Sequence, residues 1–325
     1  MLKTFNKRRP AAHVVALCAA AAAIAAPARA AAADADWIKA VGQAVTVDST
    51  GDAINAIALS SDGKQLIVDT EPTLFFLDAA SGKTARAAQQ AHRPTSGLAA
   101  PSASLARFFV TTWADLPNTD KSGRTPSRQA GELLAVDVSG KKSQHLFDLK
   151  KEPHVLAASA DGKRVALGFD DGMVQVIDGA SGKSLLGPVK LVPGMAVAGQ
   201  RIDGVSALAF SPDGARIAIA GADVSVRIVD AASGKVLTEF VYGGLSGGGT
   251  HTRVDHLAFT ADGTKLVSAA QDRNLSLHDA ATSRLLGAPV RVAAGVSALA
   301  IGADGKTVFT GDNDGRLQRW ELKAL

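Results

Sequence analysis

Cysteine is almost absent from this sequence. Its single copy, Cys18, lies within the first 30 residues. If that segment is removed, the rest of the chain has no thiol for a disulfide, a cysteine nucleophile or a cysteine-ligated metal site. Long hydrophobic runs are also lacking after residue 30, as is helical periodicity of useful length. The remaining chain is therefore expected to contain neither a membrane span nor a helical domain.

An excess of charge is lacking too, once position is considered. The chain has 35 Lys and Arg against 31 Asp and Glu, a formal net charge of +4. Five of the basic residues and none of the acidic ones fall in the first 30 residues, which leaves 30 basic and 31 acidic residues, a net of about −1. A nucleic-acid partner is not expected, because binding to phosphates requires clustered Lys and Arg.

The first 30 residues have the three parts of a secretory signal peptide. A basic start is followed by an apolar run over residues 14–26 and then by Ala28 and Ala30, the small residues that a signal peptidase accepts. As a helix the run would span about 20 Å, short of a hydrocarbon core of roughly 30 Å, so a membrane anchor is disfavoured. We expect residues 1–30 to be removed and residues 31–325 to be exported, either to the periplasm or as a secreted protein.

A phrase of about 30 residues recurs along the rest of the chain. Its clearest copy, residues 205–235, reads VSALAFSPDGARIAIAGADVSVRIVDAASGK. A degenerate copy spans residues 96–141. The other four copies begin at Ile54, Val155, Val254 and Val296. The chain therefore contains six units.

Each unit is expected to form short strands joined by tight turns. Large and small residues alternate over residues 216–220, which is typical of a strand. Asp213 and Gly214 predict a hairpin turn, because Gly accepts the positive φ that such turns need. The segment from Asp230 to Gly234 follows the third strand, and the Asp230 carboxylate is expected to accept backbone N–H groups there.

The repeats resemble the WD40 family, most closely through AFSPDG at residues 209–214 and the Val, Ile or Trp before Asp or Glu that ends the third strand. The resemblance covers almost all of residues 37–325. It implies an all-β fold, a six-bladed β-propeller with four-stranded antiparallel blades. The family's tryptophan remains only at Trp320. The other units have Leu77, Val136, Ile177, Val229 and His278 in its place. A propeller class with YVTN-type repeats stays open as the rival and predicts the same shape.

The sixth unit ends after its third strand. Residues 43–47 (QAVTV) resemble the fourth strands of other units, such as residues 288–292 (APVRV). We therefore expect the N-terminal strand to complete the sixth blade and close the ring, which removes an exposed sheet edge. Residues 31–325 then form a single propeller domain.

Long excursions from the repeat occur at only two types of connection. They are residues 113–131 between the second and third strands of blade 2, residues 188–204 between blades 3 and 4, and residues 242–253 between blades 4 and 5. Both connection types emerge on the same side of a propeller. We call that side the loop-rich face and the opposite side, which has short turns, the plain face.

Function is expected on the loop-rich face, because binding residues concentrate on loops held by a rigid scaffold. Arginine and the large aromatics are the side chains most enriched at binding hot spots. The candidate partner-binding residues are Trp113, Asp115, Arg124, Arg128, Arg201, Tyr242, His251 and Arg253. A reading in which these residues only cap blade edges or face solvent stays open.

Three patterns resemble chemical motifs but are interpreted as turns. Residues 244–248 match G-x-S-x-G around Ser246, yet that motif needs a strand-turn-helix elbow. Residues 310–321 are spaced like a calcium loop that would join two helices, whereas here they form a hairpin of the repeat. Three histidines precede first strands and are candidate metal ligands, although turn or cap roles are favoured: His92, His154 and His251.

The sequence favours a protein-interaction scaffold that binds a protein or peptide on its loop-rich face. No catalytic, cofactor-binding or metal-binding residue is assigned, and no enzyme activity is expected. The alternative is an enzyme or a small-ligand or metal binder that uses the mouth of the central channel. It requires Asp, Glu, Asn or His facing inward at matching positions in several blades.

Overall fold

The computed structural model of the chain describes residues 37–47, 51–60, 63–70, 73–89, 99–101, 107–115, 129–137, 142–197, 200–202, 204–242, 252–302 and 304–323. The chain divides into two units, Met1–Ala31 and Ala32–Leu325. All described residues belong to the second unit, so the expected signal peptide lies outside them. The described residues contain no helix with the length and apolarity that a membrane span needs.

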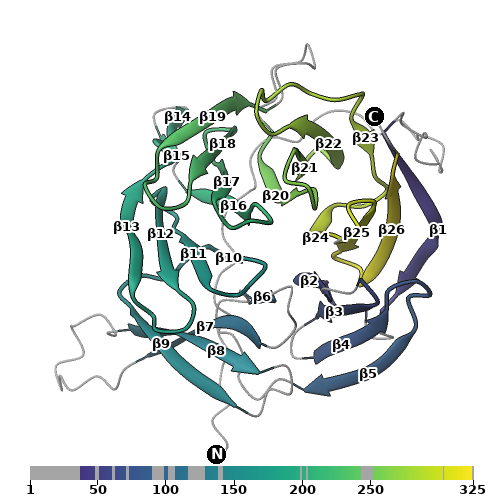
Figure 1. Ribbon diagram of the computed structural model, residues 1–325, viewed down its shortest axis with the longest axis horizontal. Coiled ribbons are helices and arrows are strands. Elements are labelled where there is room, and N and C mark those ends of the chain that lie inside the picture. The colour runs from purple at the N-terminus through teal and green to yellow at the C-terminus, as the bar shows by residue number, and fades with distance from the viewer. Residues whose placement is uncertain are drawn as a thin grey trace, which may run out of the picture. The chain divides into compact units, whose positions relative to one another are not determined.

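The second unit is a six-bladed β-propeller built from six four-stranded antiparallel sheets, as predicted (Figure 1). Blade 1 contains β2 (Ala56–Leu59), β3 (Gln65–Asp69), β4 (Thr73–Asp78) and β5 (Thr84–Gln89). Blade 2 contains β6 (Ala99–Pro101), β7 (Arg107–Asp115), β8 (Gln129–Asp137) and β9 (Ser143–Leu149). Blade 3 contains β10 (Val155–Ala158), β11 (Arg164–Gly168), β12 (Met173–Asp178) and β13 (Ser184–Lys190).

The remaining blades follow the same order. Blade 4 contains β16 (Val205–Phe210), β17 (Arg216–Gly221), β18 (Ser225–Asp230) and β19 (Val236–Val241). Blade 5 contains β20 (Val254–Phe259), β21 (Lys265–Ala270), β22 (Asn274–Asp279) and β23 (Val290–Arg291). Blade 6 contains β24 (Val296–Ile301), β25 (Thr307–Asp312), β26 (Arg316–Leu322) and β1 (Ile38–Thr46). The first strand of each blade lies innermost in the ring (Figure 1).

The N-terminal strand closes the ring, as the sequence predicted. β1 pairs antiparallel with β26, and Ile38 lies opposite Leu322. The strand is longer than the predicted residues 43–47, because it begins at Ile38 and tolerates a register shift between Val41 and Val45. Gly42, with φ of +70°, lies at that irregularity, where a side chain would be strained.

Two predicted excursions are shorter than the sequence indicated. In blade 2 the strands β7 and β8 continue to pair as far as Asp115 and Gln129, so the two ends of the segment 113–131 belong to the sheet. Between blades 3 and 4, β13 continues to Lys190. A small hairpin of β14 (Met195–Val197) and β15 (Gln200–Ile202) follows.

The turns form as the sequence predicted. The first hairpin turn of blade 4 has Gly214 at φ +68°, and the Asp213 carboxylate accepts the N–H of Ala215 at 3.0 Å. After the third strand, Asp230 Oδ1 accepts the N–H of Ser233 at 2.8 Å and its hydroxyl at 2.6 Å. The equivalent acids that make the same pair of bonds are Asp78, Asp178 and Asp279.

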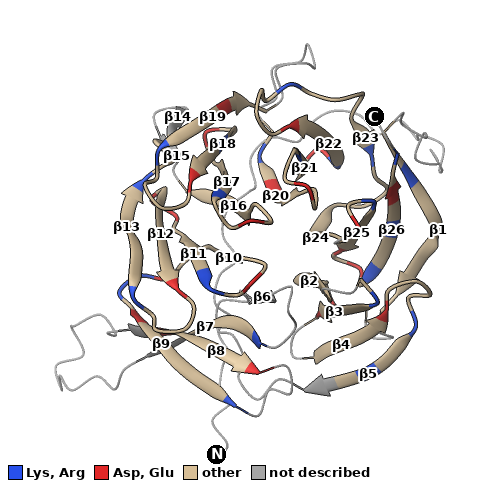
Figure 2. Ribbon diagram, viewed as in Figure 1, with Lys and Arg blue, Asp and Glu red and all other residues tan. Residues whose placement is uncertain are grey.

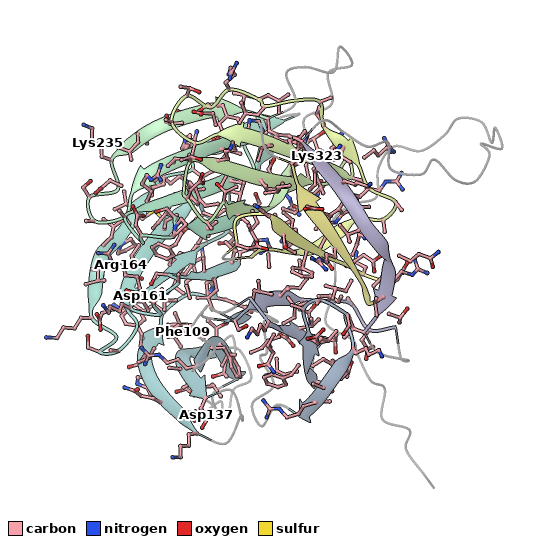
Figure 3. All side chains as sticks on the ribbon, turned by 45° about the vertical axis from the view of Figure 1, so that its right-hand side comes forward. Phe109, Asp137, Asp161, Arg164, Lys235 and Lys323 are labelled. Atoms are coloured by element: carbon pink, nitrogen blue, oxygen red, sulfur yellow. The ribbon has the colours of Figure 1, made fainter. Side chains whose placement is uncertain are left out.

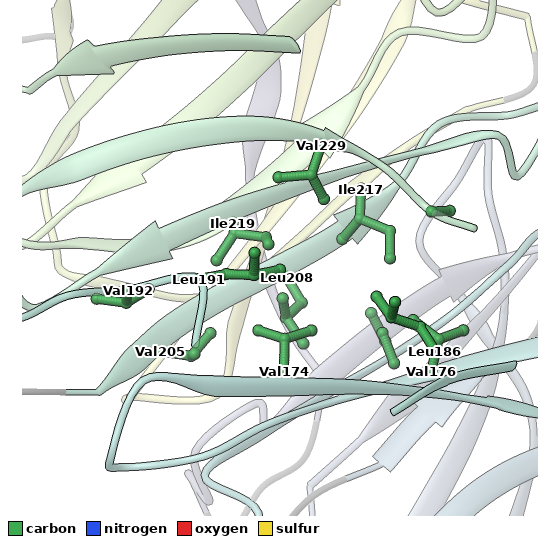
Figure 4. Packing of buried hydrophobic residues seen from close by; sticks show 13 residues of the cluster. Val174, Val176, Leu186, Leu191, Val192, Val205, Leu208, Ile217, Ile219 and Val229 are labelled. Carbon is green, nitrogen blue, oxygen red and sulfur yellow. The ribbon is translucent and has the colours of Figure 1, made fainter. Parts of the chain in front are cut away.

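The core consists of apolar layers between neighbouring blades. On β18, Val229 packs in a cluster with β12 residues of blade 3, including Val174 and Val176 (Figure 4). Its strand neighbours Val226 and Ile228 pack in the cluster with blade 5. Because alternate residues of a strand face opposite sides, a middle strand between two neighbours is apolar on both faces. This packing gives the inner strands their nearly continuous hydrophobic sequence.

Candidate functional site

The antiparallel order within each blade fixes two faces. The starts of the first strands and the turns between second and third strands lie on one side, which is the loop-rich face. Two cavities along the first strands show that these strands run in the same sense around the ring. One, of about 410 Å³, is lined by strand starts such as Asn55 and Ser206. The other, of about 360 Å³, is lined by strand ends such as Ser60 and Ser211.

Polar side chains gather at the loop-rich end of the channel. They occupy matching positions at the starts of the first strands of three blades and line the 410 Å³ cavity: Asn55, His154 and Asp255, with His256 beside Asp255. Asn55 and His154 are exposed. Below them the channel is lined by Ala, Leu, Ile and Phe side chains. The mouth is therefore a polar rim above an apolar channel.

The charges at this rim are paired. Arg253 Nε lies 2.7 Å from Asp255 Oδ1, and both side chains are partly exposed. The neighbouring His256 is held mainly neutral, because burial lowers the pKa of its imidazole more than the nearby Asp255 charge and the Val296 backbone raise it. The rim offers hydrogen-bonding groups with little uncompensated charge.

Serine hydroxyls join neighbouring blades at the same level. Ser206 Oγ donates to the carbonyl of Val254 at 2.7 Å, which joins blade 4 to blade 5. Ser297 Oγ donates to the carbonyl of Ile54 at 2.7 Å, which joins blade 6 to blade 1. These bonds hold the starts of the first strands of neighbouring blades together.

The turns between second and third strands add acidic residues to the loop-rich face. Asp170 and Asp171 form ion pairs with Lys151. Burial would lower the pKa of Lys151, but these two acids outweigh it and raise the pKa. Along the described ribbon, both acidic and basic residues are scattered among uncharged ones (Figure 2).

Blade 4 contains a buried ion cluster just below this face. Arg227 Nη2 lies 2.8 Å from Asp223 Oδ2 and 2.7 Å from Glu239 Oε1. The side chains of Arg227 and Asp223 are only 8% and 9% exposed, whereas Glu239 is 47% exposed. Burial would raise the pKa of Asp223, but hydrogen bonds from Arg227 and Ser225 outweigh it and lower the pKa. The cluster fixes the turn at Asp223.

The structure places part of the predicted contact set. Arg253 lies at the channel mouth, as described above. Trp113 and Asp115 belong to β7, and Arg201 belongs to β15; the structure describes their backbone only. Three further predicted residues lie outside the described residues: Arg124, Arg128 and His251. Whether these side chains contact a partner stays a prediction.

Tyr242 lies in the core and not on the surface. It is 7% exposed, and its hydroxyl lies 3.0 Å from Ser276 Oγ of the next blade. Its ring is tilted against His278, with ring centroids 6.2 Å apart. The tyrosine therefore joins blades 4 and 5 at the start of the segment 243–251, and little of its surface is available to a partner.

Of the three motif-like patterns, the calcium-loop-like segment contains a hairpin turn of the repeat. Residues 312–315 form the hairpin turn between β25 and β26, with Gly315 at φ +73° and Asp312 Oδ1 accepting two backbone N–H groups. Ser246, His92 and His251 lie outside the described residues. Within the part of the chain that the structure describes, no three or more His, Cys, Asp and Glu are grouped to hold a metal ion.

Sequence reasoning missed most of the polar rim of the channel. The signal was present, because the residue seven positions before the Asp of the first hairpin turn is polar in five units. These residues are Asn55, His154, Ser206, Asp255 and Ser297. An alignment of the repeats by register, in place of a search for interruptions, identifies the rim directly.

Comparison with known proteins supports the architecture. The family model of the anaphase-promoting complex subunit 4 WD40 domain matches residues 196–246. No curated protein matches the sequence. The crystal structure of the Cps50 (Swd1) β-propeller domain from Myceliophteria thermophila superposes with a TM-score of 0.60 at 12% identity, over 88% of this chain and 100% of that one. At this identity the likeness concerns the fold.

The six repeated units, their six four-stranded sheets and the matched WD40 segment lead to one assignment. The tryptophan at the end of β26 is also in place, since Trp320 Nε1 donates to Thr310 Oγ1 at 2.9 Å within the blade. The chain is a six-bladed β-propeller, and its residues 196–246 match a WD40 family model.

Proposed function

We propose that this protein is an exported interaction scaffold that binds a protein or peptide partner on its loop-rich face. The supporting observation is the one-sided distribution of features among the described residues: the hairpin β14–β15 and the polar mouth of the channel share that face. The turns of the plain face are short and repeat closely. WD40 propellers typically act as scaffolds, and no enzyme activity is proposed.

Deletion of residues 243–249 tests the scaffold. The deletion should leave the melting temperature nearly unchanged, because Tyr242 and Val254 remain in the core on either side. Capture of a partner from an extract of the exported fraction should fall at least about tenfold, the loss of a few interfacial contacts. Partner capture that is equal for the deletion variant and the parent would remove the support for this face.

Export has its own test. Expression of the full chain should give a mature protein in the periplasm or medium whose N-terminus is Ala31. N-terminal sequencing of the exported fraction measures this directly. A chain that keeps residues 1–30 and stays in the cytosol would contradict the proposal and would leave the interaction test unaffected.

A second candidate function, binding of a small polar ligand at the channel mouth, is favoured by one observation. Asn55, His154 and Asp255 occupy matching positions in blades 1, 3 and 5 around a cavity of about 410 Å³. The Asn55→Ala and His154→Ala variants should weaken ligand binding if this candidate is correct. If the scaffold is correct, the same variants should weaken protein capture, and purified protein should carry no stoichiometric small ligand or ion in mass spectrometry.

A further inference from the structure

The plain face carries a repeated contact that joins one blade to the next. The first residue of the second strand is arginine in blades 2, 3 and 4, and each donates to the glycine carbonyl in the first hairpin turn of the following blade. The pairs are Arg107 with Gly162, Arg164 with Gly214 and Arg216 with Gly263. We call these three residues the inter-blade arginines. Figure 3 labels Arg164 among them.

The inter-blade arginines fill the notch between adjacent blades. Arg216 Nη2 lies 2.7 Å from the Gly263 carbonyl oxygen, and its guanidinium lies 5.4 Å from the centre of the Phe259 ring. A Cβ added at Gly263 would lie 3.0 Å from Arg216 Nη2. The planar guanidinium therefore occupies the space beside the turn and forms both a hydrogen bond and an aromatic contact.

Between blades 5 and 6 the arginine is replaced by Lys265 at the start of β21. The equivalent glycine of blade 6 is Gly305, and a Cβ added there would meet only the Cβ of Ala261, at 3.5 Å. The Lys265 ammonium makes no hydrogen bond or ion pair with the described residues. Its side chain thus leaves open the notch that arginine fills in the three preceding junctions.

A cavity of about 310 Å³ lies in this notch. Its size is at the lower end of the range of roughly 300–1,000 Å³ for small-molecule sites. Leu277, Leu322 and Ala261 supply apolar walls. Three lysines also line it, Lys265, Lys306 and Lys323 (Lys323 is labelled in Figure 3).

The two carboxylates in the cavity wall each accept three hydrogen bonds within their own turns. Asp262 accepts the Thr260 hydroxyl at 2.6 Å and the N–H and hydroxyl of Thr264 at 3.0 and 2.7 Å. Asp304 accepts the N–H groups of Lys306 and Thr307, both at 2.9 Å, and the Thr307 hydroxyl at 2.7 Å. These acids have few lone pairs left for the lysines, so Lys265 and Lys306 keep donors available for a ligand.

We propose that the notch between blades 5 and 6 on the plain face binds a small organic anion, a carboxylate with a short apolar body. The carboxylate is bound by the ammonium groups of Lys265 and Lys306, and the apolar body lies against Leu277 and Leu322. This site is separate from the loop-rich face. It follows from the replacement by Lys265 of the arginine that three consecutive blades, 2, 3 and 4, place at this position.

The test uses hexanoate as the probe and the neutral hexanamide as its matched control. Isothermal titration of the purified full chain should show saturable binding of hexanoate with a Kd of about 1 mM or tighter. Hexanamide should bind at least about tenfold more weakly, because it cannot form a charge-assisted hydrogen bond with an ammonium. Leu277 and Leu322 pack in the cluster that contains Trp37 and Trp320, so tryptophan fluorescence gives a second readout.

Variants at the first residue of the second strand test whether the replacement of arginine by Lys265 creates the site. Lys265→Arg restores the arginine and should fill the notch, raise the melting temperature and abolish hexanoate binding while the charge is kept. Lys306→Gln should weaken binding about tenfold, the loss of one charge-assisted hydrogen bond. The matched control is Arg216→Lys at the junction of blades 4 and 5, which should lower the melting temperature and leave hexanoate binding unchanged.

Three results would overturn the proposal. They are the absence of saturable hexanoate binding to the folded parent, equal binding of hexanoate and hexanamide, or undiminished hexanoate binding by a folded Lys265→Arg variant. Circular dichroism of each variant establishes that it is folded before it is titrated.

Discussion

At the scale of single residues, the turns depend on carboxylates whose lone pairs are filled by neighbouring donors. Asp262 is the strongest case, because hydroxyl groups of Thr260 and Thr264 and the N–H of Thr264 lower its pKa from 3.8 to about 2. The same chemistry recurs in the acids that follow the third strands. The ionised form is therefore favoured in the folded chain.

The pH dependence of stability follows from this shift. Since the pKa of Asp262 is lower in the folded than in the unfolded chain, its contribution is fully present above about pH 4 and is lost as pH falls toward 2. Asp262→Asn should flatten the fall of the melting temperature between pH 4 and pH 2. Thr264→Val, which removes one hydroxyl donor, should have a smaller effect in the same direction. An unchanged slope in both variants would contradict the assignment.

The buried ion cluster of blade 4 makes a prediction at the same scale. Asp223→Ala leaves Arg227 buried without its buried partner and should cost about 3–5 kcal/mol of unfolding free energy. Glu239→Gln changes a half-exposed partner and should cost about 1 kcal/mol or less. Urea denaturation of both variants measures the difference, and equal losses would show that the cluster is not organised around Asp223.

At the scale of elements, each junction between blades is a layer of apolar side chains, and the blade 4–5 junction is unusual. Where other third strands place Leu77, Ile177 or Val229, β22 places His278, stacked on Phe240 at 4.4 Å between ring centroids. Its Nε2 is buried without a partner among the described residues. Burial lowers the pKa of His278 more than the Ser283 carbonyl raises it.

A histidine that is held neutral makes this junction sensitive to acid. The folded chain binds the proton less readily than the unfolded chain, so the stability that neutral His278 allows is present above pH 6.5 and is lost progressively below it. In the His278→Leu variant this loss should be absent. The decrease in unfolding free energy from pH 8 to pH 5 should therefore be smaller than in the parent, by about 1 kcal/mol. Thermal melts of the variant and the parent at the two pH values measure this difference. An identical pH dependence of stability in both proteins would refute the role of His278.

The elements also show what the sequence could predict. The six units, the strand order, the closing strand and the turn acids were all predicted, because each is encoded in a local pattern that repeats. The extension of β7 and β8 past Trp113 was missed, since those residues have no equivalent in other units. Tyr242 was interpreted as a surface residue because it is an aromatic residue in the excursion 242–253, whereas its position opposite Ser276 depends on packing between blades.

The polar rim and the inter-blade arginines were missed for a different reason. Each is a property of matching positions in several units, and neither interrupts the repeat. Arg107, Arg164 and Arg216 look like solvated strand ends in the sequence, and their acceptors are glycine carbonyls about 50 residues away. Such contacts become visible only when the blades are placed side by side.

At the scale of the whole molecule, the ring depends on its closing strand. Trp37 is fully buried, and its Nε1 donates to the carbonyl of Ala288 at 2.7 Å, 251 residues away. Its cluster includes Leu275 of blade 5 and Trp320 of blade 6. The start of β1 thus joins two blades and seals a sheet edge.

Removal of this anchor should affect the ring as a unit. Trp37→Ala should lower the unfolding free energy by about 3–5 kcal/mol, the usual cost of removing a large buried aromatic side chain. The neighbouring exposed Lys39→Ala should change it by less than about 0.5 kcal/mol. Differential scanning calorimetry should show a single transition at a lower temperature for Trp37→Ala; an unchanged transition would mean that β1 does not close the ring.

The central claim is that a partner binds the loop-rich face. It is tested most directly by a photo-crosslinking amino acid placed at one exposed position on each face, Asn55 at the channel mouth and Ala232 in a short turn of the plain face. Crosslinking in an extract of the exported fraction should join the partner at position 55 and leave position 232 without an adduct. A partner joined at position 232 and not at position 55 would contradict the account.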